Sequence, residues 1–180
     1  LYRMLRYFAQ PNMQNLRQIK NLFNQMEENK YCYKYPHPAV TTDCVIFGFN
    51  GERLQVLLIE RGIEPFKGRW AIPGGFIRLS ENLDNAALRI LKEKTNVDNI
   101  YLEQLYTFGD PLRYPSSRVI TCAYFALIRS DDIKLSFDNS QGITEVQWHE
   151  VYNLPTLAFD HKEIIQYSLK RTRERLEMCP

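Results

Sequence analysis

The sequence predicts an α/β sandwich, a mixed β-sheet flanked by helices, and three observations favour this fold class. Two runs of β-forming residues, 40–49 and 54–59, are joined by the Asn-Gly pair at 50–51, which is a strong short signal of a β-hairpin. An amphipathic helix is expected between strands at 82–95, and a second helix closes the order at 159–175. Helices that alternate with strands in this way cover the faces of a sheet.

Length and composition fit one globular domain with short extensions. The chain has 180 residues, of which 44% are hydrophobic, enough to bury a core. A net charge of +2 argues neither for nor against a nucleic-acid partner. The four cysteines lie far apart, as is typical of reduced thiols, and no apolar run reaches the roughly eighteen residues of a membrane span. We therefore expect a cytoplasmic protein without a membrane partner, in which Cys44 and Cys122 are small core residues.

Residues 1–34 are expected to form a helical extension and linker ahead of a domain that spans 35–180. A Pro-Asn pair at 11–12 separates two helical pieces, and the second carries an apolar stripe from Leu16 to Met26. Two short helices with basic residues also fit a DNA-binding pair, but an appendage that packs on the domain or on a second subunit is the favoured interpretation. An appended amphipathic helix of this kind makes a homodimer the expected oligomer.

Further strands are expected after the central helix, at 100–108, 119–128 and 143–148. The loop 109–118 joins the first two of these strands. Because loops at the end of a sheet concentrate recognition residues, this loop is a candidate part of a binding site. Its polar and aromatic side chains include Asp110, Arg113, Tyr114, Ser116 and Arg118.

The stretch 74–97 joins a glycine turn to the central helix. The Pro-Gly-Gly sequence at 73–75 ends the apolar run before it, and Ser80 with the acidic residues that follow is typical of a helix start. Apolar residues of the helix recur at three- and four-residue spacing, so they are expected to face the core. They are Leu83, Ala87, Leu88 and Leu91.

The spacing of this stretch resembles the Nudix box, in which a Gly is followed after five residues by Glu and after seven more by Arg. The residues that match the box are Gly75, Glu81, Arg89, Leu91, Glu93 and Val97. The sequence Gly-x-Trp-x-x-Pro-Gly-Gly at 68–75 also resembles the segment that leads into the box. The departures are Ile90 and Lys94, where the family has Glu, and Asn96, where it has Gly.

The resemblance implies a Nudix-type α/β/α sandwich whose helix carboxylates hold magnesium (Mg2+) against a diphosphate. The positions of Ile90 and Lys94 are usually direct metal ligands in the family, and residues at i and i+4 share a helix face. Glu93 is then the carboxylate that remains, and a lone carboxylate beside an ammonium is a weak site for Mg2+. Lys94 has two interpretations, a cation that approaches a ligand phosphate directly or a solvated surface lysine.

The sequence is also similar to a subgroup, the Nudix-related transcriptional regulators of NAD and sugar metabolism. The degenerate box, the strand start at 103–105 and the sequence Ala-Phe-Asp-His at 158–161 carry this similarity. By itself, the pair Asp160 and His161 would be a helix cap and its neighbour. The regulators commonly lost metal ligands, sense ADP-ribose or a sugar, and carry a winged helix-turn-helix after the Nudix domain. This chain stops at Pro180, where that module would begin, so DNA is expected as a partner only through a module absent from this chain.

Three functions are therefore open. The first is a domain that senses ADP-ribose, a sugar or a nucleotide sugar for a transcriptional regulator, with weak or no hydrolysis. The second is a Mg2+-dependent hydrolase of nucleoside diphosphate-linked compounds, in which Glu93 and Glu81 act with a loop acid such as Asp110 or Glu145. The third is a scaffold with a vestigial pocket. The candidate ligand-binding residues are Arg61, Gly74, Gly75, Arg78, Arg89, Lys94, Arg113 and Arg118.

Overall fold

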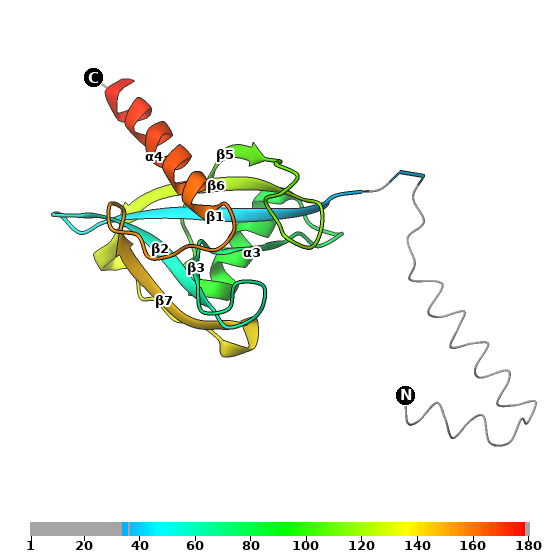
Figure 1. Cartoon of the computed structure of the whole chain (residues 1–180). Helices are drawn as coiled ribbons and strands as arrows, with labels where there is room; N and C mark the ends of the chain where they lie inside the picture. The colour runs from blue at the N-terminus through cyan, green and yellow to red at the C-terminus, as the bar shows by residue number, and fades with distance from the viewer. Residues whose placement is uncertain (1–33, 36, 179–180) are drawn as a thin grey trace, which may run out of the picture. The chain divides into compact units, whose positions relative to one another are not determined.

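The structure is a computed structural model, which describes residues 34–35 and 37–178 (Figure 1). Its internal contacts define one unit, Pro38–Pro180, and the fold below is the fold of that unit. The two helical pieces expected before residue 30 lie outside the described residues, as do Cys32 and Cys179. Within the described ranges, neither helix is both long enough and apolar enough to cross a bilayer.

The described residues build one mixed sheet in the order β3-β2-β1-β6-β5, with β4 paired to β1 and β7 paired to β2. The predicted hairpin is confirmed, because β1 and β2 pair antiparallel across the Asn-Gly turn. β6 runs parallel to β1 along the whole of both strands, which makes the sheet mixed. The strands are β1 (Ala39–Phe49), β2 (Leu54–Arg61), β3 (Trp70–Ala71), β4 (Gly74–Phe76), β5 (Glu103–Phe108), β6 (Val119–Arg129) and β7 (Ile143–Glu150).

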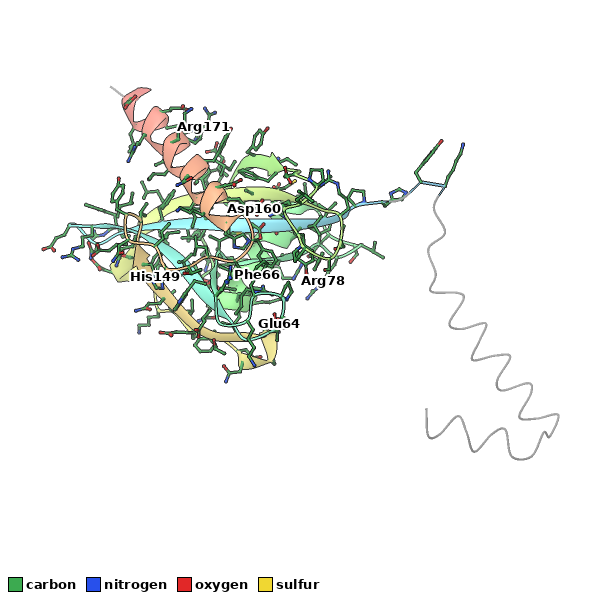
Figure 2. All side chains as sticks on the ribbon, in the orientation of Figure 1. Glu64, Phe66, Arg78, His149, Asp160 and Arg171 are labelled. Carbon is green, nitrogen blue, oxygen red and sulfur yellow. The ribbon has the colours of Figure 1, made fainter. Side chains whose placement is uncertain are left out.

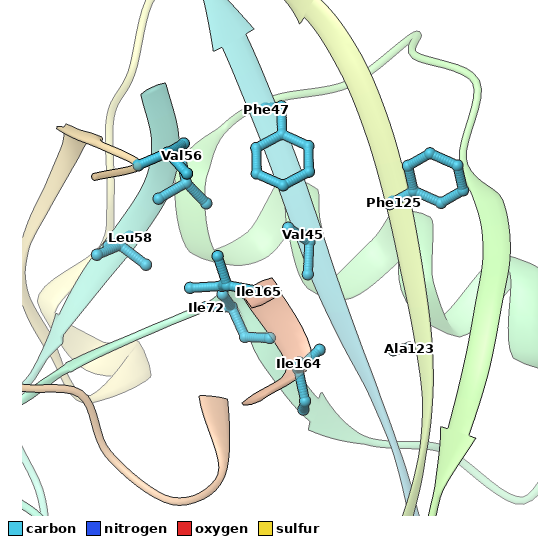
Figure 3. Packing of buried hydrophobic residues seen from close by; sticks show 10 residues of the cluster. Val45, Phe47, Val56, Leu58, Ile72, Ala123, Phe125, Ile164 and Ile165 are labelled. Carbon is cyan, nitrogen blue, oxygen red and sulfur yellow. The ribbon is translucent and has the colours of Figure 1, made fainter. Parts of the chain in front are cut away.

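Two helices cover opposite faces of this sheet, α3 (Leu83–Thr95) and α4 (His161–Met178) (Figure 1). Side chains alternate across the central strands, so that Val45 and Phe47 pack with Ile164 of α4 (Figure 3). The residue between them, Ile46, points the other way and packs with Leu91 of α3. Every residue of β1 from 41 to 48 is buried because both faces are covered. The predicted α/β/α sandwich with a mixed sheet is therefore confirmed.

The bounds of α3 follow from its caps. The side chain of Asn82 accepts a hydrogen bond of 2.8 Å from the Asn85 N–H, so Asn82 rather than Ser80 is the N-cap. At the other end Asn96 adopts the left-handed conformation, with φ of 59°, that the glycine of the box would take. The expectation that Leu88 faces the core is wrong, since it is 40% exposed, whereas Ile90 is only 2% exposed. One helical turn after Ala86 and Ala87, the buried residues are Ile90 and Leu91, so Leu88 lies outside the buried face.

The remaining elements differ from the expected bounds by one to three residues. β5 begins at Glu103 rather than at 100, and α4 begins at His161 rather than at 159. The short strands β3 and β4 and the two 3-10 turns, Ser130–Asp132 and Asn139–Gln141, were not expected from the pattern. Cys44 and Cys122 are buried free thiols, as predicted. The C-terminal half of α4 extends beyond the sheet (Figure 1).

Candidate functional site

A pocket of about 250 Å³ opens where the ends of β1, β2 and β4 meet α3 and the start of α4. Three loops contribute to the wall, namely the segment after β2, the loop 109–118 and the turn before α4. Figure 2 shows side chains of this region, with Glu64 and Phe66 on the first loop and Asp160 at the base of α4. Five of the predicted ligand-binding residues line the pocket: Arg61, Gly74, Gly75, Lys94 and Arg113.

Two cations, Arg61 and Lys94, face this pocket. The Nε of Arg61 donates to the Pro65 carbonyl at 2.8 Å, and its guanidinium lies 4.9 Å from the centre of the Phe159 ring, a cation–π contact. Burial lowers the pKa of Arg61 below its ordinary value. Lys94 is half-buried, and its ammonium has no hydrogen bond or ion pair within the described residues. Of the two interpretations of Lys94, this position favours a cation that approaches a ligand phosphate over a solvated surface lysine.

The electrostatics of Lys94 favour an anion in this space. Burial lowers the pKa of the Lys94 amine, and the neighbouring charge of Arg61 lowers it further. Asp43 and Glu93 act in the opposite direction, and their effect is the smaller. An anion between the two cations would relieve both the desolvation and the mutual repulsion. The pocket therefore has the chemistry of a site for a phosphate or diphosphate group.

The box carboxylates lie beside the pocket in an ion-pair cluster, and none of its members lines the pocket. Glu93 accepts from Arg78 on one oxygen and from Arg89 on the other, each at 2.9 Å. Arg89 also binds Glu81 through two nitrogens, and this pairing lowers the pKa of Glu81 to about 2. Arg89 further donates to the Phe76 carbonyl at 3.2 Å. These four charged side chains tie the loop before α3 to the helix and satisfy one another.

The donor set does not fit the Mg2+ that the family's box would hold. The side chain of Ile90 is buried against Gly75, where an added Cβ would lie 3.3 Å from the Ile90 Cδ1. Lys94 supplies an ammonium, and both oxygens of Glu93 already accept from arginines. Across the part of the chain that the structure describes, no three acidic, histidine or cysteine side chains converge on one point. Mg2+ prefers about six oxygen ligands in an octahedron, which this face of α3 cannot supply.

The loop acids considered as partners of Glu93 also lie off the pocket. Asp110 is exposed, and its side chain accepts from the Leu112 N–H at 2.7 Å. Glu145 is exposed on β7. Arg118 is exposed as well and donates to the Asp110 carbonyl at 3.1 Å, so this candidate ligand-binding residue holds its own loop.

A buried ionic network forms the floor of the pocket. Arg113 donates to both oxygens of Asp160, at 2.8 Å each, and to Asp43 at 3.3 Å. Asp160 directly precedes α4, and its carbonyl accepts from the Ile164 N–H at 3.2 Å, while its side chain pairs with the loop 109–118. Asp43 faces Gly74 across the β1–β4 pair, and a Cβ on Gly74 would lie 1.8 Å from its Oδ1. Asp43 was not among the predicted site residues, although an acidic residue inside a buried apolar strand is a signal that points to it.

His161 completes the floor. Its side chain is buried, and Nδ1 accepts a hydrogen bond of 3.1 Å from the backbone N–H of Ile72. Burial lowers the pKa of the imidazole below its ordinary value, so the neutral form dominates at pH 7. The other ring nitrogen, Nε2, lies 4.0 Å from Oδ1 of Asp43.

Aromatic rings from three loops form the outer wall. Tyr114 stacks on Phe159, with ring centroids 5.3 Å apart and planes 10° from parallel, and Phe159 meets Phe66 edge-on at 4.9 Å. Aromatic pairs of this geometry contribute about 0.5–1.5 kcal/mol beyond their area burial. Arg113 is the residue before Tyr114, and Asp160 is the residue after Phe159. The buried ion pair between Arg113 and Asp160 therefore holds the two stacked rings next to each other.

The sandwich, the glycine-led α3 helix and the pocket at its edge define a Nudix-type domain. The NUDIX domain family matches residues 37–168, so the chain belongs to the Nudix family. Among its relatives, the ADPR responsive transcriptional repressor NtrR of Acinetobacter baylyi is 38% identical over 143 residues. The ADP-ribose pyrophosphatase of Methanocaldococcus jannaschii is 33% identical over 155 residues. The alignments cover 78% and 86% of this chain, and 57% and 86% of the two relatives.

Solved structures give the same family. The NUDIX domain of Shewanella oneidensis NrtR, complexed with ADP ribose, superposes with a TM-score of 0.73 at 31% identity, over 83% of this chain and 97% of that one. The structure of Shewanella oneidensis NrtR with a 27mer DNA superposes with a TM-score of 0.65 at 34% identity, over 76% and 63%. This chain thus spans little more than half of the Acinetobacter repressor and less than two thirds of the DNA-bound chain.

Proposed function

We propose that this Nudix domain binds ADP-ribose or a related nucleotide sugar as a sensor for a transcriptional regulator, with weak or no hydrolysis. The observation that carries the proposal is Lys94, an ammonium in the pocket that pairs with no described residue and stands where the box has a metal-binding Glu. A lysine binds a phosphate directly as a point charge, without an intervening cation. The ligand is thereby retained while the metal that assists hydrolysis is not.

The neighbours of Lys94 support this division between binding and hydrolysis. Ile90 fills the second ligand position with hydrocarbon, and Glu93 is engaged by two arginines. Arg61 supplies a second cation for the diphosphate, close enough to depress the pKa of Lys94. The similarity to a repressor described as ADPR responsive, and to a domain crystallised with ADP ribose, supports the choice of ligand. Any contact with DNA belongs to a module outside the described residues.

A second candidate function is hydrolysis of ADP-ribose, because the archaeal ADP-ribose pyrophosphatase aligns over 86% of both chains. Under this alternative, turnover would depend on carboxylates outside the pocket or on displacement of the arginines from Glu93. The two functions differ in one measurable respect. The sensor binds ADP-ribose in the presence of a chelator and releases no AMP, whereas the hydrolase needs a divalent cation and produces AMP.

The test compares Lys94→Met with Lys92→Met. Lys92 is on the same helix, but it is exposed and pairs with Asp98 at 3.0 Å, so its loss should leave the pocket intact. With EDTA present, we expect ADP-ribose at about 100 times its Kd to raise the Tm of the native domain by roughly 5–10 °C. Loss of a charge-assisted hydrogen bond in Lys94→Met should weaken binding by about 10- to 100-fold.

Two outcomes would contradict the proposal. The first is unchanged affinity in Lys94→Met, which would place the diphosphate elsewhere. The second is vigorous, Mg2+-dependent release of AMP by the native domain that is abolished in Glu93→Gln. Calorimetry measures the affinity, and separation of AMP from ADP-ribose by ion-exchange chromatography measures the turnover.

A further inference from the structure

The protonation of His161 is fixed by the backbone. The imidazole is 4% exposed, and its Nδ1 accepts the hydrogen bond from the Ile72 N–H. A neutral imidazole has one N–H and one acceptor nitrogen, so the proton must be on Nε2. His161 lines the pocket, and within the described residues Nε2 has no partner at hydrogen-bonding distance. A side chain that is 4% exposed thus contributes to the pocket wall an N–H donor that has no acceptor among the described residues.

An acceptor lies close by, but not close enough. Oδ1 of Asp43 is 4.0 Å from Nε2, beyond the 2.7–3.2 Å range of an N–H···O bond. The other oxygen, Oδ2, accepts from Arg113 at 3.3 Å. Asp43 also lines the pocket, so the Nε2–H donor and the Oδ1 acceptor lie side by side. A group that enters the pocket between these two atoms can therefore hydrogen-bond to both.

The group that satisfies both is a hydroxyl, because it accepts one hydrogen bond and donates another. An ionised phosphate only accepts, and the carboxylate of Asp43 would repel it. The lining of the pocket therefore combines two kinds of chemistry, the cations of Lys94 and Arg61 and the donor–acceptor pair of His161 and Asp43. We propose that His161 and Asp43 together bind a sugar hydroxyl of the ligand and so select a nucleotide sugar over a free diphosphate.

This inference rests on the proposed function, since it assigns the sugar of the same ligand. It is tested with two variants that each keep one half of the imidazole. In His161→Asn, the amide oxygen reaches the place of Nδ1 and accepts from Ile72, but the Nε2 donor is lost. In His161→Gln, the amide nitrogen reaches the place of Nε2, but the acceptor for Ile72 is lost. His149→Asn is the control, because His149 lies on β7 outside the pocket, apart from Phe66 and Asp160 in Figure 2.

Each variant is titrated with ADP-ribose and with inorganic diphosphate, and its Tm is measured without ligand. We expect His161→Asn to bind ADP-ribose about tenfold more weakly, the effect of one neutral hydrogen bond, while diphosphate affinity stays within about twofold. His161→Gln should keep ADP-ribose affinity within about threefold and lose more thermal stability than His161→Asn. This opposite ranking of the two variants is the signature of a ligand contact, which a merely structural histidine does not produce.

The inference is overturned if His161→Asn binds ADP-ribose as the native domain does. It is overturned equally if either variant weakens ADP-ribose and diphosphate by the same factor, since that is the result of a general distortion. A native domain that binds neither ADP-ribose nor another nucleotide sugar refutes the proposed function, and the hydroxyl site with it. Native binding that is insensitive to His161→Asn refutes the hydroxyl site alone.

Discussion

Removal of the Arg113 guanidinium is expected to destabilise the domain more than any other single arginine change in its loops. The substitution Arg113→Met keeps much of the aliphatic stem and removes the charge. In the native fold this side chain is 4% exposed and makes three hydrogen bonds, two to Asp160 and one to Asp43. The side chains of its partners are nearly as buried, with 12% of Asp160 and 7% of Asp43 exposed. The variant therefore leaves two carboxylates without a counter-charge in a desolvated place.

The magnitude follows from that geometry. Breaking a buried ion pair by removing one partner costs about 3–5 kcal/mol, because the remaining charge is uncompensated. For a chain of this size, each kcal/mol lowers the Tm by roughly 2–4 °C, so a fall of roughly 6–20 °C is expected. A second substitution, Asp160→Asn in the Arg113→Met background, removes one of the stranded charges. It should recover part of the loss rather than add to it.

Urea denaturation followed by circular dichroism measures the free energy of unfolding of each variant. Arg118→Met is the matched control, because Arg118 lies in the same loop, is exposed and makes one hydrogen bond to a backbone carbonyl. Its loss should cost under about 1 kcal/mol. An Arg113→Met variant as stable as Arg118→Met would refute the reasoning, as would additive losses in Arg113→Met/Asp160→Asn. Either result would mean that the network is open to water.

The remaining predictions concern the box and its glycine turn. Gly74→Ala should prevent formation of the native β1–β4 pair, because the added Cβ would lie 1.8 Å from Oδ1 of the buried Asp43. A lowered Tm of this variant is the expected result. Glu81 has a folded-state pKa of about 2 against an ordinary 4.5, so its ion pair with Arg89 stabilises the fold above pH 4.5 and is lost as the pH falls toward 2. The difference in urea midpoint between the native domain and Glu81→Gln should therefore shrink across that window. Ile90→Glu with Lys94→Glu should lower the Tm without metal, and Mn2+ should restore part of it, whereas no metal response in a folded double variant would show that the carboxylates do not converge.

The elements that the sequence predicted correctly are those fixed by nearby residues. The hairpin follows from a two-residue turn between β-forming runs, and the bounds of α3 follow from Asn82 and Asn96 within the helix's own ends. Leu88 was placed wrongly because apolar residues lie on two adjacent faces of the helix, and their spacing alone does not show which face packs on the sheet. Strands β3 and β4 were missed for a related reason. They are two or three residues long, and pairing with β2 and β1 rather than their own composition makes them strands.

The site was only partly predictable, since a sequence shows a side chain's charge but not its partner. Arg78 and Lys94 looked alike as candidate ligand-binding cations, yet Arg78 pairs with Glu93, whereas Lys94 lies in the pocket with no ion pair among residues 34–35 and 37–178. The pairing of Arg113 with Asp160 joins residues 47 positions apart, and no local pattern announces it. The loss of two metal-binding glutamates was predictable, because the spacing of the box identifies Ile90 and Lys94 as the residues that replace them.

Those two departures act together on the charge of the site, and this is the physical basis of the proposal that the domain binds its ligand without hydrolysing it. Two glutamates at these positions carry two negative charges, which a bound Mg2+ neutralises. Ile90 and Lys94 instead carry one positive charge without any metal, so a diphosphate still meets a favourable potential. What the exchange removes is the metal's other role, the polarisation of a phosphoryl oxygen and the activation of water, which an ammonium with three donors does not supply. A single departure would have left either a charge mismatch or a partial metal site. Under the proposed function, the two departures together let the pocket hold a diphosphate ligand intact.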